Sequence, residues 1–188
     1  MSDILYWNNF YKINHLNSCS DFCKFIIYYF NNDIKYILDA GCGNGRDSYE
    51  LSKKYIVEGI DNCGFIPKET NNNITFKNEN FITINKDKYN LIYSRFTFHS
   101  INNEMHKIFL DSITKKDTYL AIEARSIKGI DIKLYHGKTH YRNYICLNYL
   151  KDLLIENNFE ILYIAEGNKM AVYKTEDPIC IRVIAKKL

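Results

Sequence analysis

The feature that most constrains this chain is a glycine-rich segment, Asp39-Ala40-Gly41-Cys42-Gly43-Asn44-Gly45, between an apolar run and an expected helix. A strand that ends in glycines lets the backbone approach a ligand closely, because no side chain intervenes. The dinucleotide fingerprint G-x-G-x-x-G would need a third glycine at position 46, which is Arg46. The glycines instead follow Asp39, whose carboxylate would repel a pyrophosphate and attract a cationic amino-acid end.

A second acidic residue supports a nucleoside ligand. Asp61 ends the next expected strand, close to the spacing of about 20 residues at which an acid accepts hydrogen bonds from ribose hydroxyls. Asp39 and Asp61 together therefore suit a nucleoside that carries a positively charged amino-acid tail. The alternative is a glycine-rich turn beside two unrelated acids.

The order of the predicted elements indicates an α/β protein. Strands alternate with helices along most of the chain, which predicts a parallel sheet with helices on its faces. The last two strands have no helix between them, so we expect an antiparallel hairpin at one edge. The expected strands are 36–38, 55–60, 74–77, 91–93, 119–123, 160–165 and 179–185, and the expected helices are 46–54, 103–114 and 147–157 after a helical N-terminal segment, 1–32.

Two connections depart from the regular alternation. The connection 62–73 is too short and broken for a full crossover helix, so one face of the sheet should be thinly covered. The basic segment 126–143 is expected to be a loop. No repeat or linker interrupts the chain, and residues 1–188 are expected to form a single domain.

Composition narrows the class of protein. With 188 residues, 46% of them hydrophobic and 25% charged, the chain has the profile of a soluble globular domain. It has no stretch of about 18 apolar residues and no secretory signal, so a cytoplasmic location is expected and no membrane span. The six cysteines form no C-x-x-C pair, and no histidine has the spacing of a metal ligand, so we expect no metal.

The segment Asp39–Gly45 with Asp61 resembles motifs I and II of the class I S-adenosylmethionine-dependent methyltransferases. The resemblance implies a Rossmann-like fold with a seven-stranded sheet whose last strand is antiparallel, and S-adenosylmethionine as the cofactor. It also implies that Asp39 and the loop hold the methionine portion and Asp61 the ribose. The loop residues in question are Gly41, Cys42, Gly43, Asn44 and Gly45.

The same resemblance assigns the adenine site to Asn80 and Phe81. Such enzymes usually have an aspartate before the aromatic residue, and Asn80 departs from that pattern. An asparagine carbonyl can still accept a hydrogen bond from the adenine amino group. Asn90 replaces an aspartate that often opens the fourth strand, and we interpret it as a structural position.

A narrower resemblance concerns the acceptor. Five short segments, in this order along the chain, are similar to methyltransferases that modify bacterial surface polysaccharides, including O-antigen chain terminators that act on sugars or sugar phosphates. They are Tyr6–Tyr11, Gly43–Ser48, Tyr93–Phe96, Glu123–Arg125 and His140–Arg142. The resemblance implies methyl transfer to an oxygen of a sugar or sugar phosphate during glycan synthesis.

Basic residues follow the fourth and fifth expected strands, where ligands bind in open α/β sheets. Arginines converging on one rim would suit bidentate contact with a phosphate or carboxylate, which favours an anionic acceptor, glycan or small molecule. The alternative for each is a surface ion pair. The candidate substrate-binding residues are Arg95, Arg125, Lys138 and Arg142.

A hydroxyl acceptor needs a base because it loses a proton as it attacks, whereas a phosphate oxygen does not. His99 is the first candidate and His140 the second, since imidazole titrates near neutral pH. Glu123 is the third, although an acid at a strand end often only pairs with an arginine. His99 could equally be a packing residue. The N-terminal segment around Trp7 could be a lid over the cofactor or a helix packed on the sheet.

Other functions remain open at this point. The enzyme could methylate another small molecule or RNA, although a net charge of +3 and the missing N/D-P-P-Y/W signature count against nucleic-acid bases. A catalytically silent cofactor-binding subunit is the third possibility, supported by Asn80, Asn90 and the short connection 62–73. The oligomeric state is not predicted.

Overall fold

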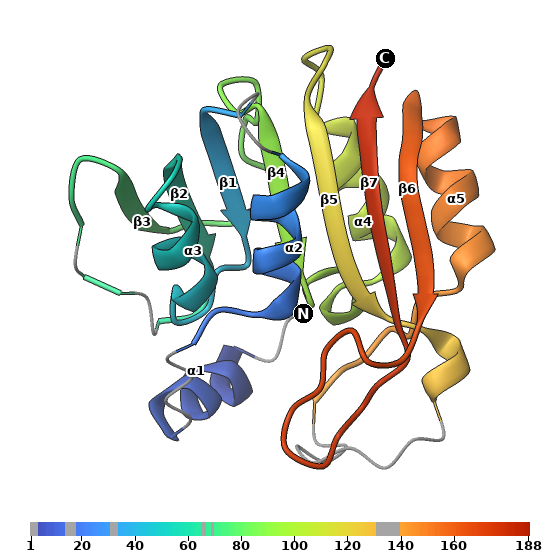
Figure 1. The fold of residues 1–188 in the computed structure, drawn as a ribbon, viewed down its shortest axis with the longest axis horizontal. Coiled ribbons are helices and arrows are strands. Elements are labelled where there is room, and N and C mark those ends of the chain that lie inside the picture. Colours follow the sequence, from blue (N-terminus) through green and yellow to red (C-terminus); the bar gives the residue numbers. More distant parts are fainter. Residues whose placement is uncertain (1–3, 14–17, 31–33, 65–66, 69, 131–139) are drawn as a thin grey trace.

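The chain forms one seven-stranded sheet, which the computed structural model describes over residues 4–13, 18–30, 34–64, 67–68, 70–130 and 140–188 (Figure 1). The strand order is β3-β2-β1-β4-β5-β7-β6. The strands are β1 (Tyr36–Ala40), β2 (Ile56–Asp61), β3 (Ile74–Asn78), β4 (Leu91–Arg95), β5 (Tyr119–Arg125), β6 (Phe159–Gly167) and β7 (Cys180–Lys187).

The pairing confirms the predicted topology. The first five strands are parallel, and β7 runs antiparallel to both β5 and β6. The last two strands therefore form the expected hairpin, with β6 at the edge of the sheet. This is the Rossmann-like fold with an antiparallel last strand. Because β1, β2, β4 and β5 are parallel, their carboxyl ends meet at one edge of the sheet (the carboxyl edge).

Helices cover both faces of the sheet. In Figure 1, α2 (Asp21–Tyr29) and α3 (Arg46–Leu51) lie on one face, and α4 (Asn103–Asp111) and α5 (Leu147–Glu156) lie on the other. Successive strand residues alternate between the two cores, because side chains along a strand point to opposite faces. In β4, for example, Ile92 belongs to the α4–α5 core, whereas Leu91 and Tyr93 belong to the α2–α3 core.

The helix starts follow from capping residues. Ser20 caps α2 by accepting a hydrogen bond from the Cys23 backbone N–H. Asn102 caps α4 in the same way through the Met105 N–H. The helix expected over 46–54 ends earlier, at Leu51, because residues 52–54 form the turn that leads into β2.

The described part of the 62–73 connection contains no helix, in agreement with the prediction of a thinly covered face. A short turn closed by hydrogen bonds between Asn71 and Ile74 opens β3 instead. Within the expected loop 126–143, residues Ile127–Gly129 form a single 3₁₀ turn.

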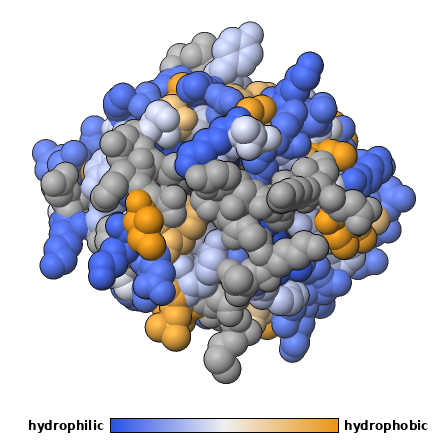
Figure 2. All heavy atoms as spheres, turned by 90° about the horizontal axis from the view of Figure 1, so that it is seen from below, coloured by the Kyte–Doolittle hydropathy of each residue, from blue (hydrophilic) through white to orange (hydrophobic). Residues whose placement is uncertain are grey.

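Two further segments lie at the carboxyl edge. Helix α1 (Ile4–Ile13) lies below the tip of β1, and the long β6–β7 connection descends to the same level (Figure 1). From below, Figure 2 shows a mainly hydrophilic surface with isolated hydrophobic side chains at this edge. Among the described residues, no helix has the length and apolar character needed to cross a bilayer.

Candidate active site

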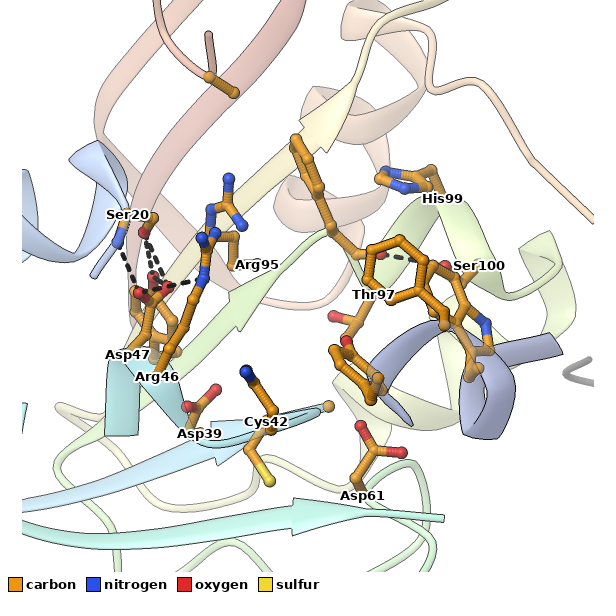
Figure 3. A pocket seen from close by; sticks show the side chains of 18 of the residues that line it. Ser20, Asp39, Cys42, Arg46, Asp47, Asp61, Arg95, Thr97, His99 and Ser100 are labelled. Carbon is orange, nitrogen blue, oxygen red and sulfur yellow. Dashed lines mark hydrogen bonds and ion pairs between the residues drawn. The ribbon is translucent and has the colours of Figure 1, made fainter. Parts of the chain in front are cut away.

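A cavity of about 610 Å³ opens at the carboxyl edge of the sheet. The glycine loop and the ends of β1, β2, β4 and β5 form its floor, while α1 and the β6–β7 connection contribute walls. This is the position at which open α/β sheets bind their ligands. Most of the predicted site residues line this cavity (Figure 3).

The glycine loop packs too closely for side chains at two of its positions. Gly41 and Gly43 have φ angles of 81° and 54°, which disfavour any residue with a Cβ. A Cβ at Gly41 would overlap the Thr97 side chain, and one at Gly43 would overlap the Tyr11 phenol. Gly41 lines the cavity together with Cys42 and Asn44, whereas Gly43 lies against Tyr11.

Asp61 is held against this loop. Its Oδ2 accepts a hydrogen bond from the Gly43 N–H at 2.9 Å, and its Oδ1 accepts from the Cys63 N–H at 2.9 Å. A carboxylate has about four acceptor positions, so two remain for a ligand. Figure 3 shows Asp61 and Asp39 on either side of Cys42 in the cavity.

Asp39 is the more buried of the two acids, with 3% of its surface exposed. Burial raises the pKa of Asp39 to about 7. A hydrogen bond from Ser48 Oγ at 2.5 Å opposes this shift, because it favours the ionised carboxylate. The negative charges of Asp47 and Asp61 raise this pKa further. A cation bound beside Asp39 would stabilise its carboxylate, because opposite charges favour ionisation.

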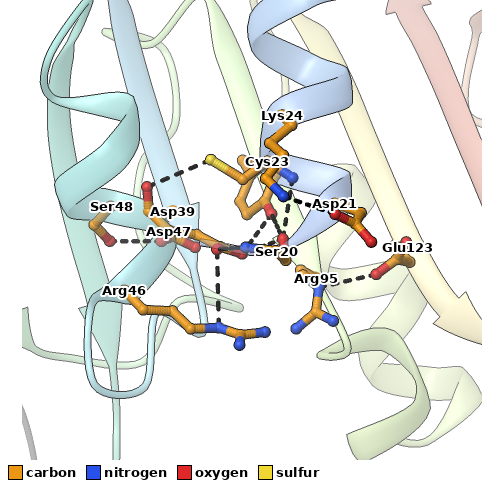
Figure 4. Close-up of polar contacts among 11 residues, drawn as sticks. Ser20, Asp21, Cys23, Lys24, Asp39, Arg46, Asp47, Ser48, Arg95 and Glu123 are labelled. Atoms are coloured by element: carbon orange, nitrogen blue, oxygen red, sulfur yellow. Dashed lines mark hydrogen bonds and ion pairs between the residues drawn. The ribbon is translucent and has the colours of Figure 1, made fainter. Parts of the chain in front are cut away.

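A buried network that sequence reasoning missed ties α2 to α3 (Figure 4). Asp47 accepts hydrogen bonds from the Ser20 N–H, the Ser20 hydroxyl and the Tyr93 hydroxyl, each at 2.7 Å. It thereby joins the start of α2, the start of α3 and β4 directly behind the glycine loop. The sequence gave no signal for this network, since Ser20 and Tyr93 lie 27 and 46 residues from Asp47 in the chain.

The residues assigned to adenine follow β3 in the chain. Asn80, Phe81 and Ile82 all line the cavity. Asn80 Oδ1 accepts a hydrogen bond from the Ile82 N–H at 3.0 Å, which leaves its second lone pair for an adenine amino group. Asn90 lies outside the cavity lining and accepts hydrogen bonds from the N–H groups of Lys35 and Tyr36, which is a structural role.

Two arginines at the opposite end of the cavity have unsatisfied nitrogens. The Nη1 atoms of Arg125 and Arg142 are buried and make no hydrogen bond to any described residue. Arg125 pairs through Nη2 with Glu176, an acid of the β6–β7 connection that no sequence signal identified. Burial and the charge of Arg125 lower the pKa of Arg142. Lys138, the remaining predicted cation after β5, lies outside the described residues.

His99 lines the cavity, but the ring nitrogen that could accept a proton is already occupied by a hydrogen bond. Its Nδ1 accepts from the Arg125 N–H at 3.1 Å, so in the neutral ring Nε2 carries the proton and can only donate. Burial, followed by the charges of Arg125 and Arg142, lowers the pKa of His99 well below its usual range. The geometry opposes the expected proton-accepting role and favours that of a donor.

The other two candidate bases are also engaged. His140 stacks on Tyr6 with ring centroids 4.0 Å apart, and its Nε2 accepts from Arg142 Nε at 3.0 Å. Glu123 is fully buried, lies outside the cavity lining, and pairs with Arg95 and with Arg182. Glu123 therefore positions arginines, which was the alternative interpretation of an acid at a strand end.

Helix α1 contributes aromatic side chains to the cavity wall. Tyr6, Trp7, Phe10 and Tyr11 all line it, and none of the described residues of the helix is buried. Asn8 accepts a hydrogen bond from the Gly64 N–H at 2.7 Å, which links α1 to the segment after β2. The helix thus lies across the carboxyl edge and not on a face of the sheet (Figure 1).

The residues present fit a sulfonium nucleoside with an amino-acid tail. One end of the cavity carries two acids beside a glycine-rich loop, and an aromatic residue with an amide follows at the adenine position. Among the residues that the structure describes, no three potential metal ligands lie together.

Comparison with known proteins agrees with this geometry. A sequence model of the methyltransferase domain family matches residues 14–164. No curated protein sequence matches the chain. Among solved structures, an S-adenosylmethionine-dependent methyltransferase from Anabaena variabilis has a TM-score of 0.73 at 19% identity, over 98% of this chain and 93% of that one.

Two further structures share the fold. An S-adenosylmethionine-dependent methyltransferase from Methanosarcina mazei has a TM-score of 0.68 at 20% identity, over 87% of this chain and 97% of that one. The 1,6-didemethyltoxoflavin-N1-methyltransferase of Burkholderia thailandensis, solved with its acceptor and S-adenosylhomocysteine, has a TM-score of 0.67 at 16% identity, over 88% and 76% of the two chains.

Proposed function

The chain belongs to the methyltransferase domain family, and from this premise we propose that it transfers a methyl group from S-adenosylmethionine to an oxygen of a small anionic acceptor. The cofactor is S-adenosylmethionine. Asp39 and the loop Gly41–Gly45 would hold its methionine portion, Asp61 its ribose hydroxyls, and Asn80 with Phe81 its adenine. The position of the acids supports this assignment, because Asp39 and Asp61 both lie beside the glycine loop, where the positively charged part of the cofactor would bind.

One observation carries the choice of acceptor. Arg125 and Arg142 each bury an Nη1 group without a hydrogen-bond partner among the described residues, in the same cavity as the glycine loop. Leaving a buried charged donor unsatisfied is costly, so a ligand that accepts from both groups would be favoured. A phosphate or carboxylate has this chemistry. The similarity of five segments to polysaccharide-modifying enzymes favours a sugar phosphate in glycan synthesis.

All three candidate bases are engaged in hydrogen bonds or ion pairs, which supports an acceptor that is already ionised and needs no base. When bound, S-adenosylmethionine supplies an electrophilic methyl group whose transfer leaves a neutral thioether, and a hydroxyl acceptor would release its proton. A phosphate or carboxylate oxygen has no proton to lose. His99 would orient such an oxygen by donating from Nε2, and Arg125 with Arg142 would neutralise the remaining charge and fix it in line.

Helix α1 would cover both ligands. Tyr11 contacts the glycine loop, whereas Tyr6 stacks on His140 at the basic end, so one helix reaches both parts of the cavity. This supports the proposal that residues 1–188 act as one domain with α1 as its lid. The rest of the expected lid segment 1–32 does not share this role, because α2 packs on the sheet with Phe22 and Ile26 in the core.

Calorimetry and a methyl-transfer assay test the proposal. We expect micromolar binding of S-adenosylmethionine and S-adenosylhomocysteine, and transfer of a labelled methyl group to a member of a panel of sugar phosphates, nucleotide sugars and carboxylic acids. Absence of binding up to millimolar cofactor would contradict the methyltransferase function. Binding without transfer to any of these compounds, or to RNA, would instead favour a silent cofactor-binding subunit.

A further inference from the structure

The amino-acid tail of the cofactor carries a carboxylate as well as an ammonium group, and Asp39 can attract only the ammonium. Both groups are attached to one carbon atom, so the partner of the carboxylate must lie next to Asp39. Two arginines meet this requirement. Figures 3 and 4 both show the side chains of Arg46 and Arg95 near each other, and Figure 3 shows both above Asp39 in the cavity.

Each of these arginines is oriented by a carboxylate that binds only its Nε side. Arg95 Nε donates to Glu123 Oε1 at 2.9 Å, and Arg46 Nε lies 3.8 Å from Asp47 Oδ1. Among the described residues, no hydrogen bond uses the terminal nitrogens of either guanidinium. The side chains are only 16% and 17% exposed, which keeps their positions defined.

The electrostatic neighbours of Arg95 differ from those of the arginines at the acceptor end. Burial alone would lower the pKa of Arg95, but the carboxylates of Glu123 and Asp47 raise it. Arg142, in contrast, is influenced by burial, then by Arg125, and by Glu176. The ion pairs give the same division, since Arg95 and Arg46 pair with Glu123 and Asp47 whereas Arg125 pairs with Glu176. We therefore treat Arg46 with Arg95 and Arg125 with Arg142 as two groups, although the sequence suggested a single basic rim.

Phe96 lies between the two groups along the chain and contacts both. Its ring centroid is 4.3 Å from the Arg95 guanidinium carbon and 5.3 Å from that of Arg125. The backbone of Phe96 has a φ of 61°, an unfavourable conformation for a bulky residue that often occurs at functional sites. Hydrogen bonds from its N–H to Glu123 O and from Ser100 Oγ to its carbonyl hold it there.

We propose that Arg46 and Arg95 bind the carboxylate of the cofactor's methionine portion, and that Phe96 separates them from Arg125 and Arg142, which bind the acceptor anion. This inference rests on the proposed function. It assigns Arg95 to the cofactor, whereas the sequence placed it with the acceptor. The tail of the cofactor is then bound as a zwitterion, with its ammonium at Asp39 and its carboxylate at the arginine pair.

Two ligands that differ only in the carboxylate test the assignment. S-adenosylhomocysteine has the full tail, and S-adenosyl-3-thiopropylamine lacks the carboxylate but keeps the amine. Isothermal titration calorimetry of the full chain would measure both with Arg46→Ala, Arg95→Gln and the control Lys24→Ala. Lys24 also lines the cavity, but its side chain is 64% exposed and pairs with Asp21.

We expect Arg46→Ala and Arg95→Gln each to weaken S-adenosylhomocysteine binding by about tenfold or more, the loss typical of a hydrogen bond to a charged group. Binding of the thiopropylamine should change less than about threefold, and Lys24→Ala should affect neither ligand. Comparing two ligands on one variant separates loss of the contact from misfolding. Arg46→Ala gives the clearer test, because Arg95→Gln also removes an ion pair with the buried Glu123 and can disturb the fold.

Equal losses for both ligands, or unchanged binding of S-adenosylhomocysteine, would overturn the inference. If Arg46→Ala leaves cofactor binding intact but raises the acceptor KM, the pair binds the acceptor instead and the assignment is wrong. None of these outcomes affects the proposed function, which is tested separately by cofactor binding and methyl transfer in the wild-type protein.

Discussion

The two ends of the cavity bind by different physical means. The cofactor end consists mainly of backbone and acids, with the glycine loop and Asp61 lying within 2.9 Å of one another. The opposite end consists of side chains from α1, the end of β5, the segment after residue 139 and the β6–β7 connection, and its charge is carried by Arg125 and Arg142. The first end suits the positive groups of the cofactor, with Arg46 and Arg95 proposed for its carboxylate, and the second end suits an anion.

This difference in charge matches the proposed reaction. A sulfonium at the acidic end and an anionic oxygen at the basic end attract their own partners and would be repelled from the wrong positions. The cavity can therefore orient both ligands before transfer. If the comparison is correct, substitutions at one end should affect one ligand and leave the other unchanged.

The largest expected effect is at the cofactor end. Asp61→Ala should weaken S-adenosylhomocysteine binding by about 100-fold, because it removes the ribose acceptors and the hydrogen bond that holds Gly43 N–H. Calorimetry on the variant measures the loss. Asp117→Ala, at an acid whose side chain is 77% exposed, is the control and should bind like the wild type. Wild-type affinity in Asp61→Ala would show that Asp61 does not bind the cofactor and would contradict the assignment of this end of the cavity.

At the acceptor end, Arg142→Ala should raise the acceptor KM by about tenfold, since it removes one charged donor to the anion. The dissociation constant of S-adenosylhomocysteine should stay within about twofold, because Arg142 lies with Arg125 and Glu176 and not with the glycine loop. Steady-state kinetics with the acceptor found by methyl transfer measures the first quantity and calorimetry the second. Lys128→Ala, an exposed cation after β5, is the matched control.

An unchanged KM in Arg142→Ala would mean that the buried Nη1 groups do not bind the acceptor. If Arg142→Ala also weakened S-adenosylhomocysteine binding by about tenfold, the two ends of the cavity would not bind their ligands independently.

Asp39 should make cofactor binding depend on pH. Its pKa is raised to about 7 by burial and by the neighbouring Asp47 and Asp61, so the carboxyl is protonated below this pH. The ammonium of the tail attracts only the ionised form, and binding must therefore weaken as the pH falls. Between pH 7.0 and pH 5.5 we expect S-adenosylhomocysteine to lose about tenfold in affinity.

Asp39→Asn isolates this effect, since it cannot titrate. The variant should bind more weakly at pH 7.0 and show little further loss at pH 5.5. If the pH dependence of the variant matches that of the wild type, another group is responsible, and the titration of Asp39 does not control cofactor binding in this pH range.

The same contrast explains what could be predicted from the sequence. The fold and the cofactor end follow from short segments in which neighbouring residues act together, such as Asp39–Gly45 and the strand that ends at Asp61. Local patterns of apolar residues also predicted all seven strands, with boundaries that shifted by a few residues. The antiparallel hairpin followed from the lack of a helix between its strands.

The acceptor end could be predicted only in part, because its contacts join distant residues. Arg125 and Arg142 were identified by type and position, but Glu176 lies 51 residues beyond Arg125 and carries no motif. The tautomer of His99 depends on the Arg125 backbone N–H, which no sequence pattern reports. Glu123 was a candidate base by residue type alone, and its burial between two arginines became visible only in three dimensions.

The smallest expected effects concern α1, which reaches both ends of the cavity through different tyrosines. Tyr11 contacts Gly43, so Tyr11→Phe should weaken S-adenosylhomocysteine binding by about two- to fivefold and leave the acceptor KM unchanged. Tyr6 stacks on His140, so Tyr6→Phe, which keeps the ring, should change the acceptor KM by no more than about twofold, and Tyr6→Ala by about fivefold. Calorimetry and kinetics on the three variants measure these shifts. If both Tyr11→Phe and Tyr6→Ala change the same constant, α1 acts on the cavity as a whole, and the two ends do not bind independently under the helix.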